Sequence, residues 1–265
     1  MRFSDLHNDA ITNLPAKKFS RYIARAQKDG VQTILISIWT TQMQNPLQQI
    51  KYYKQILDSL KTNVNLLLHI EDAWFITQQN IHELIALKPY SVGLTWNTNN
   101  NLAGGAYGNG NLTELGRYII EELVANGIHI DLAHLNKQSF YQVAELLKTP
   151  LLCTHTCFDE VHPHPRNLDR QQIQTIVDSG GIIGLTLVND FLGEPGILAH
   201  IEYFLKNFGD SNLSMGTDFF GTDNLPKGLR KYAHFRRLRK HFPPETLDKI
   251  FHINYHDFRT ANATN

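Results

Sequence analysis

Short apolar segments rich in β-branched residues recur along the chain, and each is followed by a longer segment with helical periodicity. The apolar segments are continuous runs rather than alternations of apolar and polar residues, which is typical of parallel strands covered on both faces. The pattern predicts eight such strands, at residues 3–7, 31–39, 64–70, 91–96, 128–134, 151–156, 181–188 and 213–218.

Amphipathic segments between and after these strands predict the helices, at residues 47–60, 81–87, 115–126, 139–147, 170–179, 197–207, 229–241 and 245–258. Strands and helices that alternate in this way favour a closed (β/α)8 barrel of the TIM type. An open doubly wound sheet stays possible, but the first turn lacks the Gly-x-Gly-x-x-Gly pattern. No linker or shift in composition marks a boundary, so residues 1–265 are expected to form a single barrel domain.

Composition and charge narrow the class of protein without changing this picture. Lys plus Arg and Asp plus Glu number 25 each, so charge gives no support for a nucleic-acid or membrane partner. Asp5, His7 and Asp9 interrupt any N-terminal apolar run, which argues against a secretory signal and favours a cytoplasmic protein. Cys153 and Cys157 are too few for a disulfide framework and are expected to be reduced thiols.

Imidazole and carboxylate side chains lie at the carboxyl ends of five expected strands. They are His7, Asp9, Glu71, His134, His155 and Asp218. Strand ends of this kind meet at one rim of a barrel, and His7 and Asp9, two residues apart on a strand, are expected to point to the same side. A single histidine at such a place is more often structural than a ligand. Buried together without a metal, however, three carboxylates would carry a large desolvation cost, so the set predicts a metal site.

The number of candidate ligands favours two metal ions. Six is too many for one catalytic zinc, which takes about three protein ligands and a water. Two divalent ions about 3.5–4 Å apart can share a bridging carboxylate and hold a hydroxide between them. Glu71 lies between the first pair and the two later histidines in strand order, which makes it the natural bridge.

Several short motifs together resemble those of a known family. They are His7-Asn8-Asp9, Ile70-Glu71, Asp131-Leu132-Ala133-His134, Thr154-His155-Thr156, His164-Pro165-Arg166-Asn167 and Gly216-Thr217-Asp218-Phe219. In this order and spacing, from residue 3 to about residue 258, the chain resembles the membrane (renal-type) dipeptidases, peptidase family M19 of the amidohydrolase superfamily.

The resemblance implies roles for the matching residues. His7 and Asp9 would bind one Zn²⁺, Glu71 would bridge, and His134 with His155 would bind the second Zn²⁺. Asp218 would contact the first ion and carry a proton from the bridging water to the leaving amine. Arg166 would bind the terminal carboxylate of the substrate, the alternative being a salt bridge within its loop. Family members are often dimers, so a homodimer is possible.

Two residues depart from the family pattern. Trp96 occupies the place where mammalian members carry a histidine that polarises the scissile carbonyl, a form that bacterial relatives share. Its indole can donate one hydrogen bond but cannot carry a proton or a charge, so we expect it to contact the substrate. Phe220 stands where many members have a second Asp. His69, beside the Ile70-Glu71 pair, is expected to be structural.

The sequence therefore leads to three hypotheses about function. The first is a cytoplasmic binuclear zinc dipeptidase that cleaves the amide bond of small dipeptides by attack of the metal-bridging hydroxide. The second keeps the metals and changes the bond to another small amide, a lactone or an ester, because a fold does not fix a function. The third is a metal-binding protein without catalytic activity.

Overall fold

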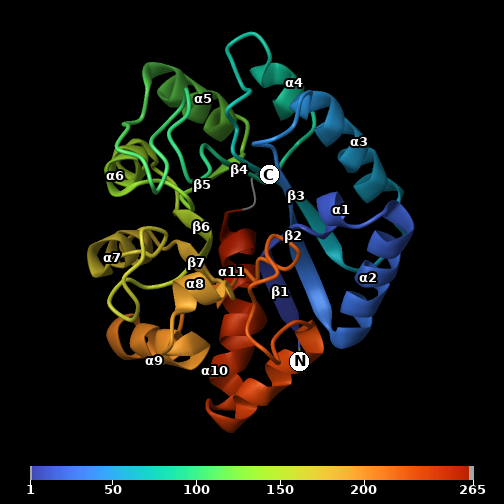
Figure 1. Ribbon diagram of the computed structural model, residues 1–265, viewed down its shortest axis with the longest axis vertical. Coiled ribbons are helices and arrows are strands. Elements are labelled where there is room, and N and C mark those ends of the chain that lie inside the picture. The colour runs from blue at the N-terminus through green and yellow to red at the C-terminus, as the bar shows by residue number, and fades with distance from the viewer. Residues whose placement is uncertain (1, 263–265) are drawn as a thin grey trace.

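A computed structural model describes residues 2–262 of the chain, and it shows a closed barrel of eight parallel strands in sequence order (Figure 1). The strands are β1 (Phe3–Asn8), β2 (Val31–Trp39), β3 (Asn65–Glu71), β4 (Ser91–Gly93), β5 (His129–Asp131), β6 (Leu152–Thr156), β7 (Ile182–Leu185) and β8 (Leu213–Met215). The predicted (β/α)8 fold is thus confirmed. Each predicted strand is present, although the later strands are shorter than their apolar runs.

Helices surround the strands (Figure 1). They are α1 (Ala10–Asn13), α2 (Ala16–Asp29), α3 (Pro46–Ser59), α4 (Ile81–Ile85), α5 (Glu114–Ala125), α6 (Lys137–Leu146), α7 (Arg170–Asp178), α8 (Asn189–Leu192), α9 (Gly196–Phe208), the 3₁₀ helix η1 (Tyr232–Lys240), α10 (Pro244–Asp248), the π-helical turn η2 (Lys249–Ile253) and α11 (Asn254–Ala261). Within residues 2–262, no helix is long and apolar enough to cross a membrane.

Three helical predictions need correction. The helix expected at 229–241 begins only at Tyr232 and is a 3₁₀ helix, and the one expected at 245–258 is interrupted by η2. Helix α2 was not predicted at all. Its buried residues Phe19, Ile23 and Ala26 have the spacing of a helical face, and exposed Lys and Arg residues occupy the other faces, so the sequence carried a signal for this helix.

The pairing of β2 with β3 carries Glu71 to the rim of the barrel. The two strands stay in register over seven pairs, from Thr33 opposite Asn65 to Trp39 opposite Glu71. Both strands therefore end at the same level, with Glu71 as the last residue of β3. Eight strands of this kind bring their carboxyl ends together around one opening.

Helix α11 covers the opposite, amino-terminal end of the barrel. Its Tyr255 and Phe258 pack with Leu6 of β1, Leu35 of β2, Leu152 of β6 and Ile182 of β7. The Phe258 ring also lies 5.7 Å from that of His129, the first residue of β5. One helix that contacts strands from different sides of the barrel must lie across its end.

Phe3 packs the C-terminal elements against the first strand, and truncation of its side chain should destabilise the folded protein. The ring is fully buried and lies 4.8 Å from Phe235 and 5.3 Å from Phe251. Phe3→Ala should lower the free energy of unfolding by about 3–5 kcal/mol, because both the buried area and the packing are lost. Urea denaturation measures this loss. Tyr52→Ala, at a ring that is 56% exposed, should stay within about 0.5 kcal/mol of the parent. Equal effects of the two changes would contradict the anchoring role.

Candidate active site

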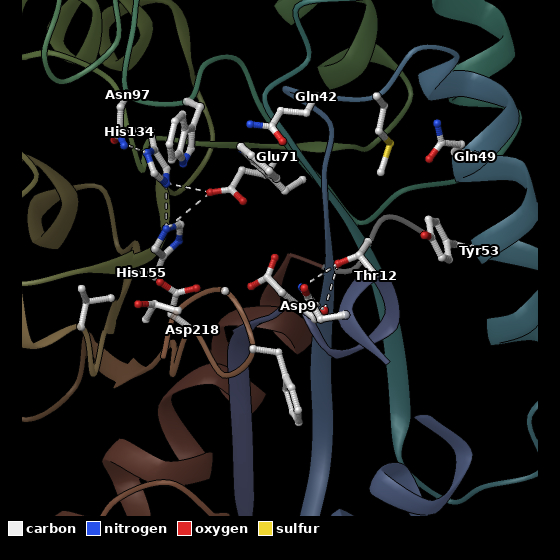
Figure 2. Close-up of a pocket in the computed structure, with 18 of the residues that line it drawn as sticks. Asp9, Thr12, Gln42, Gln49, Tyr53, Glu71, Asn97, His134, His155 and Asp218 are labelled. Atoms are coloured by element: carbon white, nitrogen blue, oxygen red, sulfur yellow. Dashed lines mark hydrogen bonds and ion pairs between the residues drawn. The ribbon is translucent and has the colours of Figure 1, made fainter. Parts of the chain in front are cut away.

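The six predicted ligands converge at the carboxyl rim, and all of them except His7 line a cavity of about 870 Å³ (Figure 2). Nε2 of His7 lies 3.3 Å from Asp9 Oδ2, 3.7 Å from Glu71 Oε2 and 3.9 Å from Asp218 Oδ1. These three carboxylates come from the ends of β1, β3 and β8. His7 and Asp9 point to the same side, as predicted. Asp9, however, lies just beyond β1 and before α1, rather than on the strand.

The second half of the cluster lies on the other side of Glu71. Nε2 of His134 is 2.7 Å from Glu71 Oε1, and Nε2 of His155 is 3.7 Å from the same oxygen. The two imidazole Nε2 atoms are 2.9 Å apart. Glu71 therefore has one oxygen toward His7 and the other toward the two later histidines, which is the placement expected of a shared ligand.

The backbone is strained where two of these side chains enter the cluster. His134 and Asp218 have φ of 68° and 57°, in the left-handed region that non-glycine residues rarely adopt. Such residues cost about 1–3 kcal/mol each and persist where the surrounding structure fixes them, commonly at functional sites. In both cases the strain turns a side chain inward just after a short strand.

The hydrogen-bond network leaves the cluster rich in lone pairs and poor in protons. Nδ1 of His134 lies 2.9 Å from Asn97 Oδ1 and is assigned as the donor, so that its Nε2 carries a lone pair. Arg166 Nη2 donates to His155 Nε2 at 3.2 Å, so that atom carries a lone pair as well. The two Nε2 atoms 2.9 Å apart then repel each other unless a cation lies between them. Asp9 Oδ2 is buried and has no hydrogen-bond partner among the described residues. This donor set of nitrogen and oxygen atoms fits zinc or a similar divalent ion.

Proton affinities in the cluster point to the same conclusion. Burial lowers the pKa of His7, but Asp9 and Glu71 outweigh it and raise that pKa to about 10. Burial raises the pKa of Glu71 to about 8, and burial together with Asp9 raises that of Asp218 to about 7. Crowded carboxylates that hold protons above their usual pKa are a site where positive charge is strongly favoured.

Arg166 and Trp96, the two predicted substrate contacts, line different cavities. Trp96 lines the large cavity and packs against Trp39, with ring centroids 5.2 Å apart. Arg166 is 3% exposed, and its Nη2 lies 3.2 Å from His155 Nε2. It lines a second cavity of about 480 Å³ rather than the large one. Its Nε has no hydrogen-bond partner among residues 2–262, so the guanidinium retains capacity for a carboxylate.

Polar, uncharged side chains such as Gln42, Gln49 and Tyr53 form part of the cavity wall (Figure 2). Asp190 adds a carboxylate to the same wall. Phe220, also in the cavity wall, has φ of 71° and packs edge-on against Tyr22.

Several neutral or buried residues that support the ligands were not identified from the sequence. Asn97 holds His134, and Thr154 lies behind His7 and His155. His69 is fully buried between Ser91 and Asp131, in agreement with a structural role. The sequence indicated Asn97 only by its place in the loop after β4, at the carboxyl rim of the barrel. Cys153 and Cys157 are buried free thiols, as predicted.

A (β/α)8 barrel that gathers six such donors at its carboxyl rim has the architecture of the metal-dependent barrel hydrolases. The family model of the membrane dipeptidases, peptidase family M19, matches residues 5–248. The chain belongs to this family, as the sequence motifs predicted.

Two relatives match part of the chain. An uncharacterized protein in the pqqA 5′ region of Klebsiella pneumoniae is 32% identical over 166 residues, which cover 56% of this chain and 61% of the relative. An uncharacterized dipeptidase of Schizosaccharomyces pombe is 24% identical over 162 residues, or 58% of this chain and 35% of the relative. In each case, the match spans less than two thirds of the relative.

Among solved structures, a metallopeptidase from Rhodobacter sphaeroides shares the fold with a TM-score of 0.84 and 20% identity. The similarity covers 99% of both chains. That structure holds a phosphinate mimic of the dipeptide L-Ala-D-Ala.

Proposed function

We propose that this chain is a binuclear zinc dipeptidase. The observation that carries the proposal is the position of Glu71, with one carboxylate oxygen toward His7 and the other toward His134 and His155. His7 and Asp9, with Asp218 in reach, would hold one Zn²⁺. His134 and His155 would hold the other, and Glu71 would bridge. Membership of the M19 family supports a dipeptide as the substrate.

Bound zinc would activate water and polarise the carbonyl of the scissile amide. Proton transfer and substrate binding are assigned to the protein's own side chains. Asp218 lies at the rim with its side chain 15% exposed and its Oδ1 3.9 Å from His7 Nε2, so its carboxylate can accept and release a proton beside the first zinc position. We assign it the transfer of a proton to the leaving amine.

Substrate binding is assigned to Arg166 and Trp96, which line different cavities. Arg166 supplies a buried positive charge beside His155, suited to the carboxylate of a dipeptide. Trp96 contributes an aromatic surface and one N–H donor where the family's histidine would stand. The Rhodobacter sphaeroides structure supports a dipeptide-sized ligand in this barrel, since its ligand mimics L-Ala-D-Ala.

Metal analysis combined with a hydrolysis screen tests the proposal. The purified protein should contain about two zinc ions, and should cleave members of a library of L,L- and L,D-dipeptides. Chelation should reduce the rate to background and lower the melting temperature, and added zinc should restore both, because a ligand that binds only the folded state stabilises it. C-terminally amidated dipeptides should be poorer substrates, since they lack the carboxylate assigned to Arg166.

Lactones and phosphodiesters belong in the same screen. If the metal-loaded protein cleaves one of these and no dipeptide, the reaction class is wrong although the metal site stands. If it cleaves nothing while holding two ions, it is a metal-binding protein without this activity.

A further inference from the structure

The hydroxyl of Thr154, on β6, lies directly behind two candidate ligands. Its Oγ1 is 2.9 Å from His155 Nδ1 and 3.4 Å from His7 Nδ1. The same atom is 2.5 Å from Asp131 Oδ2. None of these four residues is more than 2% exposed, so water cannot replace the contacts. One oxygen atom thus joins a carboxylate of β5 to histidines of β6 and β1.

Counting protons fixes the direction of these hydrogen bonds. Asp131 Oδ1 accepts from the backbone N–H groups of Ala133 and Thr154, at 3.0 and 2.8 Å. Its Oδ2 accepts the hydroxyl proton of Thr154. A hydroxyl has only one proton, so the remaining lone pairs of Oγ1 can only accept. Nδ1 of His7 and of His155 must therefore both carry a proton, which leaves Nε2 as the nitrogen of each ring that is directed toward the cluster.

The backbone holds Thr154 at this position. Its carbonyl oxygen is closely approached by Gly184 and Gly216, where an added Cβ would come within 1.9 and 1.8 Å. Side chains at either position would push β6 away from its neighbours. Thr154 therefore cannot move together with a displaced histidine. Its hydroxyl keeps one position relative to the imidazole rings of His7 and His155.

We propose that Thr154 and Asp131 are positioning residues that set the Nδ1–H tautomer of His7 and His155 together, and so prepare both for metal binding through Nε2. The inference rests on the metal site of the proposed function. A neutral imidazole binds a metal only through its unprotonated nitrogen, and partners of this kind fix which nitrogen that is. Because His7 and His155 belong to different halves of the cluster, one hydroxyl serves both zinc positions.

Nitrogen-15 spectra of the histidines test the tautomers. In [¹⁵N]histidine-labelled, chelator-treated protein, the neutral ring of His155 should show the Nδ1–H pattern. His7, whose pKa is raised to about 10, is protonated at both nitrogens there, so its Nδ1–H is read in the zinc-loaded protein. Signals are assigned by their loss in His7→Gln and His155→Gln. Thr154→Val should convert His155 to mixed tautomers, and Thr154→Ser should restore the Nδ1–H form. Retention of a pure Nδ1–H pattern in Thr154→Val would overturn the proposal.

Asp131→Asn should reverse the direction of the hydrogen bond between residue 131 and Thr154. The two backbone N–H donors select the amide oxygen at the Oδ1 position, so the NH₂ group falls at Oδ2 and donates to Thr154 Oγ1. The Thr154 hydroxyl must then donate to a histidine Nδ1. At least one of His7 and His155 should switch to the Nε2–H tautomer, which cannot bind zinc. If neither histidine switches, the assigned chain of hydrogen bonds is wrong.

Zinc affinity, measured by competition with a chromophoric chelator, gives a second readout. Thr154→Val should weaken both zinc positions by about 10- to 100-fold, the usual effect of losing a group behind a ligand. Thr186→Val is the matched control, because the Thr186 hydroxyl is buried and has no hydrogen-bond partner among the described residues. Equal affinities for the two variants would count against the proposal.

The two proposals can fail separately. Wild-type protein that shows the expected tautomers but cleaves no dipeptide would refute the dipeptidase assignment and leave the role of Thr154 intact. If the protein is an active dipeptidase but Thr154→Val changes neither the histidine tautomers nor the zinc affinity, the role of Thr154 is refuted and the dipeptidase assignment stands.

Discussion

Glu71→Gln should abolish hydrolysis and remove zinc from both halves of the cluster. Bound metals supply several kcal/mol of transition-state stabilisation. At about 1.4 kcal/mol per tenfold in rate, the loss should reach about 10³-fold in kcat/KM. The expected size follows from the two-sided contacts of Glu71, whose oxygens lie 3.7 Å from His7 Nε2 and 2.7 Å from His134 Nε2. Metal content and initial rates on the best dipeptide are the measurements.

The same variant should fold normally without metal. Gln keeps the volume of Glu71 and resembles its protonated form, which burial favours by raising the pKa of Glu71 to about 8, so the metal-free melting temperature should not fall. The rise in melting temperature on adding zinc should disappear. Glu83→Gln, at an exposed residue paired with Lys51, should behave as wild type. A Glu71→Gln protein that keeps two tightly bound zinc ions would refute the bridging role.

Asp218→Asn should separate proton transfer from metal binding. General acid–base groups contribute about 10²–10⁴-fold, and we expect kcat to fall within this range while zinc content stays near that of the wild type. Asn tolerates the left-handed backbone that Asp218 adopts, at φ of 57°, so the loop should keep its shape. The remaining ligands His7, Asp9 and Glu71 still hold the first ion. Steady-state kinetics and metal analysis of one preparation give both quantities.

A nearby carboxylate serves as the control for this change. Asp223 is exposed in the same segment after β8, and Asp223→Asn should leave kcat unchanged. Full activity of Asp218→Asn would exclude Asp218 from proton transfer. Loss of zinc together with activity would instead show that Asp218 acts mainly as a ligand.

The barrel and its candidate ligands could be predicted because both depend on local patterns. Strands buried on both faces are continuous apolar runs, and the polar residue that ends each run marks the rim, as His155 and Glu71 do. Helix α2 escaped prediction although Phe19, Ile23 and Ala26 carry its signal. Its mean hydropathy is low, but its apolar stripe with charged residues on the other faces is the pattern of an amphipathic helix.

The supporting residues could not be predicted in the same way. Thr154 looks like an ordinary strand residue, and its importance comes from contacts with Asp131 of β5 and His7 of β1, which only the closed barrel brings together. The displacement of Arg166 from the large cavity is likewise a property of the loop in space. Residue type predicts chemistry, whereas access and hydrogen-bond direction depend on the assembled structure.

The seam between β1 and β8 has a consequence for how the protein is made. Asp5 pairs with Met215 across this seam and accepts hydrogen bonds from both the backbone N–H and the hydroxyl of Thr217. His7 leaves the ribosome early and Asp218 late, so the cluster stays incomplete until the last strand is inserted. Capture of the ion assigned to His7, Asp9 and Asp218 would therefore be a late event in biogenesis, and occupancy of that position would distinguish finished molecules from arrested nascent chains.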